Sequence, residues 1–214
     1  DNAEIHQALL KNIDISTIPI LMVDINKKLY QKELKSVLLV PDFYLIHRNF
    51  SNKIKCIKEG SKSHPFNLRK DVAIWRGAQT GGTYNIETKD TLPRYRLVDF
   101  SYKHPDLVDA RFTNYECQIS QNESGAKYIE FMKQRFGYEP QKNYIDFENQ
   151  TRYKYIISVD GNCSAWERII FALNMGSVLL YHTDHVQFFT PYLKDGVHYV
   201  GINSDMSDMK QKIN

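Results

Sequence analysis

Strand-like and helix-like segments alternate along most of the chain, and this alternation is the strongest constraint on its fold. Apolar runs typical of strands occur at residues 71–75, 107–112, 153–159, 177–181 and 197–202. Helical spacing of apolar residues lies between them, at residues 92–103, 124–137 and 164–175. Because parallel strands are joined by crossover helices, we predict an α/β fold with a mostly parallel sheet and helices on both faces.

The first third of the chain follows this alternation less closely. Residues 18–25 and 35–46 are apolar runs of the kind that form buried strands, whereas residues 47–71 are polar and basic and are typical of a surface connection. We therefore expect a partial N-terminal region at 1–70 and a C-terminal domain at 71–214.

Charge and cysteine content exclude several classes of protein. The net charge of +3 is too small to indicate a nucleic-acid surface, and the basic stretch 53–70 does not alternate cations with aromatic residues. That stretch fits a solvated connector or a contact with an anionic membrane surface. The three cysteines (Cys56, Cys117 and Cys163) lack zinc-site or disulfide-framework spacing, and His182 with His185 has no third metal ligand nearby in sequence.

One strand–turn–helix unit, residues 154–181, predicts an anion site. The turn Asp160–Cys163 follows an apolar strand, Ser164 and Glu167 fit a capping box, and Gly176 stands where a helix would end. Helix N-termini at the carboxyl ends of parallel strands attract anions, and Arg168 would add a full charge. The alternative is that Arg168 is a solvated residue and Asp160 a turn former.

A second loop, "WRGAQTGG", points to the same chemistry. Arg76 directly follows a strand, and Gly77, Gly81 and Gly82 would let backbone amides approach an oxyanion. The loop is neither a P-loop nor a dinucleotide fingerprint, so an ordinary flexible loop is the alternative.

Several motifs together resemble glycosyltransferase family 90, the CAP10-like group. They are "AIWRGAQTGG", "RYRLVDFSYKHPDLVDARFT" and the long segment from "YKYIISVDGNCSAWERIIFALNMGSVLLY" to "FFTPYLKDGVHYVGINSDMSDM", and they cover about residues 71–209. This group contains protein O-glucosyltransferases, capsule xylosyltransferases and lipopolysaccharide-modifying transferases. The resemblance implies a GT-B architecture of two Rossmann-like halves, with an N-terminal half that is incomplete here.

The resemblance also implies a reaction. We expect inverting transfer of a hexose or pentose from a UDP-sugar to a hydroxyl of a glycan, lipopolysaccharide or protein, with no metal and no cofactor besides the donor substrate. The alternative is a non-catalytic glycan- or protein-binding module on the same fold. The compartment stays open: cytoplasmic or peripheral to the membrane for a bacterial protein, and the secretory lumen for a eukaryotic one.

Site residues follow from the matched motifs. Arg76 and Arg168 would hold the donor diphosphate, and Asp109 and Thr113 would lie beside the nucleotide base. The remaining donor-site residues are Gly77, Asp160, Gly161, Ser164 and Ala165. The expected ribose or sugar contacts are Asp184, His185 and Gln187.

An inverting transferase also needs a general base, which this family takes as a carboxylate from the N-terminal half. Asp24, after "IPILMV", is the first candidate, and Asp42 of "VPDFYL" is the second. The chain is short for a complete two-domain enzyme, so we expect either a fragment of a longer protein or an unusually small acceptor half.

Overall fold

A five-stranded parallel sheet forms the centre of the C-terminal part. The computed structural model describes residues 19–30, 36–46, 49–114, 118–137 and 140–213. The strand order is β5-β4-β6-β7-β9, and every neighbouring pair is parallel. The strands are β4 (Lys70–Ala78), β5 (Val108–Asn114), β6 (Tyr153–Val159), β7 (Val178–His182) and β9 (Val200–Gly201). The predicted mostly parallel α/β sheet is confirmed.

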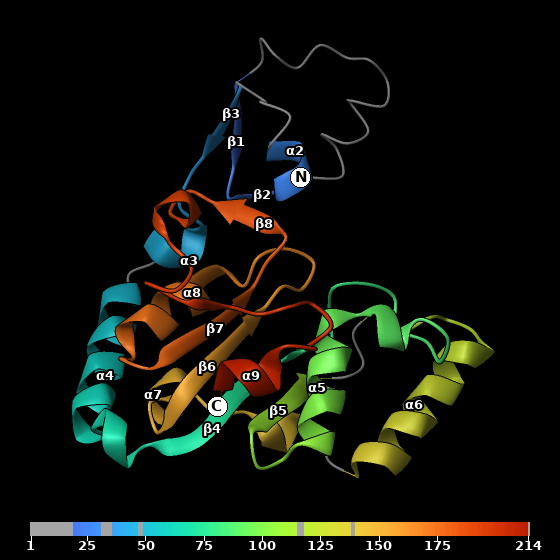
Figure 1. Cartoon of the computed structure of the whole chain (residues 1–214). Coiled ribbons are helices and arrows are strands. Elements are labelled where there is room, and N and C mark those ends of the chain that lie inside the picture. Colours follow the sequence, from blue (N-terminus) through green and yellow to red (C-terminus); the bar gives the residue numbers. More distant parts are fainter. Residues whose placement is uncertain (1–18, 31–35, 47–48, 115–117, 138–139, 214) are drawn as a thin grey trace.

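Helices cover both faces of this sheet, as predicted (Figure 1). One face carries α5 (Pro93–Lys103), α6 (Glu123–Phe136) and α9 (Met209–Ile213). The other carries α4 (Phe50–Ser63), α7 (Phe147–Gln150) and α8 (Trp166–Asn174). The remaining short helical segments are α2 (Lys27–Tyr30), α3 (Phe43–Ile46), η1 (Phe66–Leu68), η2 (Lys89–Thr91), η3 (Pro140–Asn143) and η4 (Thr190–Tyr192).

Strand alternation divides the core into two layers. Trp75 and Ile157 face the α5 side, whereas their neighbours Ile74 and Ile156 face the α8 side, and all four are fully buried. Successive side chains of a strand point to opposite faces, so a strand covered on both sides reads as a continuous apolar run. This explains why "YIISV" shows no polar alternation.

Helix α4 corrects the expectation of a surface connection at 47–71. Its Ile57 is 2% exposed and belongs to the same core layer as α8. The helix was missed because most of its residues are polar and charged, and only a narrow apolar stripe faces the sheet. Part of the region assigned to the N-terminal side thus packs on the C-terminal sheet, although the domain division itself stays a prediction.

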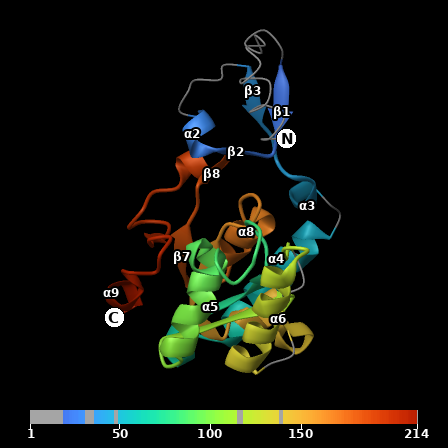
Figure 2. The ribbon, with the colours of Figure 1, turned by 90° about the vertical axis from the view of Figure 1, so that its right-hand side faces the viewer.

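The two N-terminal apolar runs form short strands outside the main sheet. β1 (Ile20–Met22) pairs in parallel with β3 (Val37–Leu39), and β2 (Asp24–Asn26) pairs antiparallel with β8 (His185–Gln187). Figures 1 and 2 show β1 and β3 beyond β8, away from α5 and α6. We expected buried strands, but Leu21 and Leu38 are 67% and 62% exposed, because the described residues cover only one face of the β1–β3 pair.

Helix α8 begins later than its sequence suggests. The predicted capping box is wrong: Ala165 is the N-cap residue, and no side chain among the described residues caps the helix. The backbone N–H of Ser164 donates instead to Asp24, and Trp166 has a positive φ of 31°. The predicted end is confirmed, since Gly176 follows the C-cap with a φ of 65°, a conformation that glycine adopts without strain.

Candidate functional site

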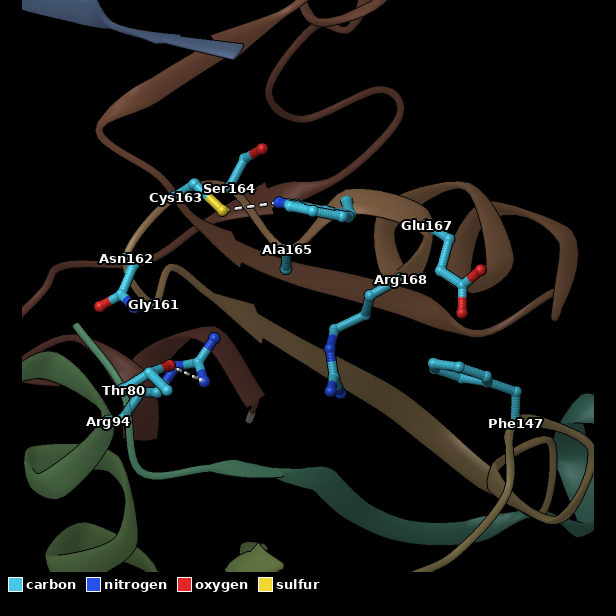
Figure 3. Close-up of a pocket in the computed structure, with 11 residues that line it drawn as sticks. Thr80, Arg94, Phe147, Gly161, Asn162, Cys163, Ser164, Ala165, Glu167 and Arg168 are labelled. Atoms are coloured by element: carbon cyan, nitrogen blue, oxygen red, sulfur yellow. Dashed lines mark hydrogen bonds between the residues drawn. The ribbon is translucent and has the colours of Figure 1, made fainter. Parts of the chain in front are cut away.

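A pocket of about 320 Å³ lies at the carboxyl edge of the sheet, where the loops after β4 and β6 meet the start of α8 (Figure 3). Ligands of open α/β sheets bind at this edge, because helix N-termini and irregular loops gather there. The pocket brings the turn residues Gly161–Cys163 together with Arg168, whereas Asp160 of the same turn does not line it. Its lining residues are Thr80, Arg94, Phe147 and the segment from Gly161 to Arg168.

Arg168 offers the pocket a charged donor. Its Nη2 donates to the carbonyl oxygen of Arg76 at 2.5 Å, and its guanidinium carbon lies 5.7 Å from the centre of the Phe147 ring. Its Nη1 is buried and has no hydrogen-bond partner among the described residues. Burial, with a smaller contribution from Arg94, lowers the pKa of Arg168 to about 10. An anion in the pocket would accept a hydrogen bond from Nη1 and would offset the destabilisation of the Arg168 charge by burial and by Arg94.

Arg94 is a second arginine at this site, and our reading of the sequence missed it. It donates to the carbonyl oxygens of Asp160 and Ala78 and to the hydroxyl of Thr80, at 2.9, 2.7 and 2.7 Å. These bonds tie the loop after β4 to the loop after β6. Burial lowers the pKa of Arg94, and its guanidinium extends toward the same space as that of Arg168 (Figure 3).

A sequence signal for Arg94 did exist. Pro93 marks the first turn of α5, and a cation in a first turn opposes the helix dipole, so an arginine there suggests a partner outside the helix. That partner, the glycine-rich loop, ends at Gly82, twelve residues before Arg94.

Close packing of the two loops requires glycine. A Cβ on Gly161 would lie 2.4 Å from the Thr80 hydroxyl and 2.7 Å from Arg94 Nη2. Gly81 has a φ of 101° and faces the Gly161 backbone. Its N–H donates to the side-chain oxygens of Gln118 and Asn162. The expectation that this amide points toward an oxyanion is therefore wrong.

Asp24 lies directly behind the pocket wall. Its Oδ2 accepts the backbone N–H of Ser164 at 2.8 Å and is 3.2 Å from His185 Nδ1. Burial acts to raise the pKa of Asp24, but His185 and Ser164 outweigh it and hold the pKa below its usual value. The general-base candidate from the N-terminal part therefore adjoins the predicted anion site.

The turn residue Asp160 belongs to the same polar cluster. Its Oδ2 accepts the N–H of Asp184 at 2.6 Å, and its Oδ1 is buried without a partner among the described residues. Burial raises the pKa of Asp160. Gln187 lies opposite Asp24 in the β2–β8 ladder, so the segment expected to contact sugar or ribose does reach this region.

Arg76 and Gly77, predicted at the diphosphate, do not line the pocket. The Arg76 guanidinium turns toward β5, where it bonds to Asp109 Oδ2 at 2.7 Å and to the carbonyl oxygen of Asn143 at 2.8 Å. A Cβ on Gly77 would lie 2.6 Å from the ring of Trp75, so this glycine makes room for a core side chain. Arg76 reaches the site through its carbonyl oxygen, which accepts from Arg168.

The other predicted residues lie elsewhere. Asp109 and Thr113 are on the edge strand β5, and Asp109 lines a separate pocket of about 390 Å³ while bridging Arg76 and Arg111. Asp42 accepts the N–H groups of Tyr44 and Leu45 at the start of α3.

Two further properties bear on the class of site. Among the described residues, no cluster of three or more His, Cys, Asp or Glu side chains is arranged to hold a metal ion. None of the described helices combines the length and apolarity that crossing a bilayer requires.

Comparison with known proteins confirms the family that the sequence motifs resemble. Residues 44–214 match glycosyl transferase family 90. The uncharacterized protein 179R of Invertebrate iridescent virus 6 is 29% identical over 182 residues, which cover 77% of this chain and 15% of the viral protein. Protein O-glucosyltransferase 1 of Rattus norvegicus is 28% identical over 146 residues, which cover 67% of this chain and 34% of the rat protein.

The chain thus spans about a third or less of the length of these relatives. The family match nevertheless includes every element of the five-stranded sheet and the whole pocket at its carboxyl edge. The chain belongs to glycosyl transferase family 90.

Proposed function

We propose that this chain transfers a sugar from a UDP-sugar to a hydroxyl group with inversion, and that the donor diphosphate binds between Arg168 and Arg94. The observation that carries the proposal is the buried Arg168 Nη1, which lacks a hydrogen-bond partner among the described residues. A desolvated cation beside a second cation is favourable only when an anion joins them. The start of α8 adds the positive end of its dipole.

The same groups would assist the reaction. Negative charge accumulates on the leaving UDP as the bond to the sugar breaks, and charged donors fixed in advance stabilise that charge without reorganising. The two arginines fill this role in our proposal, so the transfer needs no metal ion.

Asp24 is the general base in this proposal. As the acceptor oxygen bonds to the anomeric carbon, the carbon–oxygen bond to UDP breaks and the hydroxyl proton passes to the Asp24 carboxylate. A base must be ionised to accept that proton, and the lowered pKa of Asp24 meets this condition at neutral pH.

The acceptor and the sugar are proposed more broadly. The rat relative is named a protein O-glucosyltransferase, which favours glucose and a protein hydroxyl. A pentose donor, a glycan or lipopolysaccharide acceptor, and a peripheral membrane contact through the lysines of α4 remain alternative proposals.

Titration calorimetry with UDP tests the site, and release of UDP from UDP-glucose, UDP-xylose and UDP-galactose tests the chemistry. We expect UDP to bind the wild-type chain and the Arg152→Met control, because Arg152 is exposed just before β6 at the opposite edge of the sheet. UDP binding without release from any sugar would instead favour the non-catalytic module. Absence of UDP binding would refute the donor site.

A further inference from the structure

The β2–β8 ladder places a histidine beside the proposed base. Asp24 pairs with Gln187 and Asn26 pairs with His185 in antiparallel register. Residues two apart on a strand share a face, so His185 is the diagonal neighbour of Asp24, within reach of its side chain. The contact joins residues far apart in the chain and depends on this register.

The contact is close and protected from water. His185 Nδ1 lies 3.2 Å from Asp24 Oδ2, and the side chains are 12% and 7% exposed. His185 Nδ1 makes no hydrogen bond of regular geometry with the described residues, so this contact is an ion pair when the ring is protonated. Because Ser164 N–H also binds Oδ2, both contacts fall on one oxygen. Neither of these two contacts engages the other carboxylate oxygen, Oδ1.

Charged groups from several elements surround His185. Asp160 approaches from the loop after β6, Asp184 adjoins it in the chain, and His182 stands at the end of β7. Lys27 of α2 lies close by, with its Nζ donating to the carbonyl oxygen of Thr183. Burial alone would lower the pKa of His185, but the carboxylates, first of all Asp24, raise it. The net effect is a raised pKa, so these groups stabilise the imidazolium form relative to an isolated histidine.

We propose that His185 is the positioning residue for Asp24: it holds Oδ2 against the Ser164 amide, turns Oδ1 toward the acceptor hydroxyl, and sets the basicity of the carboxylate by its charge. This inference rests on the proposed function. It adds a residue whose charge controls the pH range of transfer.

The test compares kcat/KM against pH in the wild type and three variants of the full chain, with UDP-sugar as substrate. His185→Ala removes position and charge, whereas His185→Asn keeps a neutral donor near the place of Nδ1. His104→Gln, after α5, is the matched control.

We expect His185→Ala to lower kcat about 10- to 100-fold, as misplacement of a reacting group does, with UDP affinity within about twofold of wild type. The acid limb of its profile should move to higher pH, because the carboxylate loses the cation that lowers its pKa. His185→Asn should recover part of kcat but keep the shifted limb, and His104→Gln should match wild type.

Two failures can be told apart. Transfer with an unshifted acid limb and unchanged kcat in His185→Ala would overturn the role of His185. If the wild type does not transfer sugar, the proposed function fails, and the role of His185 is then tested by NMR titration of the histidines in the wild type and in Asp24→Asn. An unchanged His185 pKa in Asp24→Asn would show that the two side chains are not coupled and would overturn the inference as well.

Discussion

Replacing Arg168 by methionine should stabilise the free protein while weakening nucleotide binding. Burial lowers the pKa of Arg168 by more than two units below its usual value, to about 10. Each pKa unit corresponds to about 1.4 kcal/mol, so the charged state is disfavoured by about 3 kcal/mol relative to the unfolded chain. Methionine has a similar length and can pack against Phe147 without a charge. Loss of the hydrogen bond to the Arg76 carbonyl offsets about 1–2 kcal/mol of this gain.

We therefore expect the free energy of unfolding to rise by about 1–2 kcal/mol in Arg168→Met, measured by urea denaturation. The sign follows from the direction of the shift, since a cation whose pKa is lowered by folding destabilises the folded state at every pH below that pKa. The difference should stay constant between about pH 6 and 8, because Arg168 remains protonated in both states.

Nucleotide binding should change in the opposite direction. A hydrogen bond to a charged group is worth about 1.5–3 kcal/mol, so the dissociation constant for UDP should rise about 10- to 150-fold. Calorimetry on Arg168→Met and on the exposed control Arg152→Met measures this change. Lower stability together with unchanged UDP affinity in Arg168→Met would refute our account of the guanidinium as an unsatisfied, desolvated donor.

Other perturbations test the rest of the site. Arg94→Ala should lower the free energy of unfolding, measured in urea, by about 2–3 kcal/mol, because the loop carbonyls lose their donor. Wild-type stability of this variant would contradict the role of Arg94 in joining the two loops. Gly161→Ala should lower both the melting temperature and UDP affinity, since its Cβ would lie 2.4 Å from the Thr80 hydroxyl, and an unchanged melting curve would exclude that clash. The Asp24 contribution to stability is complete above pH 3.8 and is lost as pH falls through its lowered pKa. The His185 contribution is complete below pH 6.5 and is lost as pH rises through its raised pKa. Urea unfolding at a series of pH values should therefore show the largest difference between wild type and Asp24→Asn between these two values, and a flat difference would count against the pair.

Secondary structure and sheet type could be predicted where the signal is local. The apolar run 153–159, Pro93 before a helix and Gly176 after one all act through neighbouring residues, so the pattern determines the element. The same reasoning missed α4, whose apolar stripe is too narrow to stand out among lysines, and it placed a capping box at Ser164.

The candidate site was predictable only in part, for a physical reason. The strand–turn–helix pattern pointed to Arg168 and the turn before it, because they belong to one local unit. Three other features of the site depend on strand order and register. Arg76 turns toward Asp109, Arg94 bonds to two loops, and Asp24 meets Ser164 and His185. The local elements and the parallel sheet are predictable from periodicity and turn residues, because these signals act over a few neighbouring positions. Which charged groups face one another depends on the folded arrangement, because those contacts join distant segments.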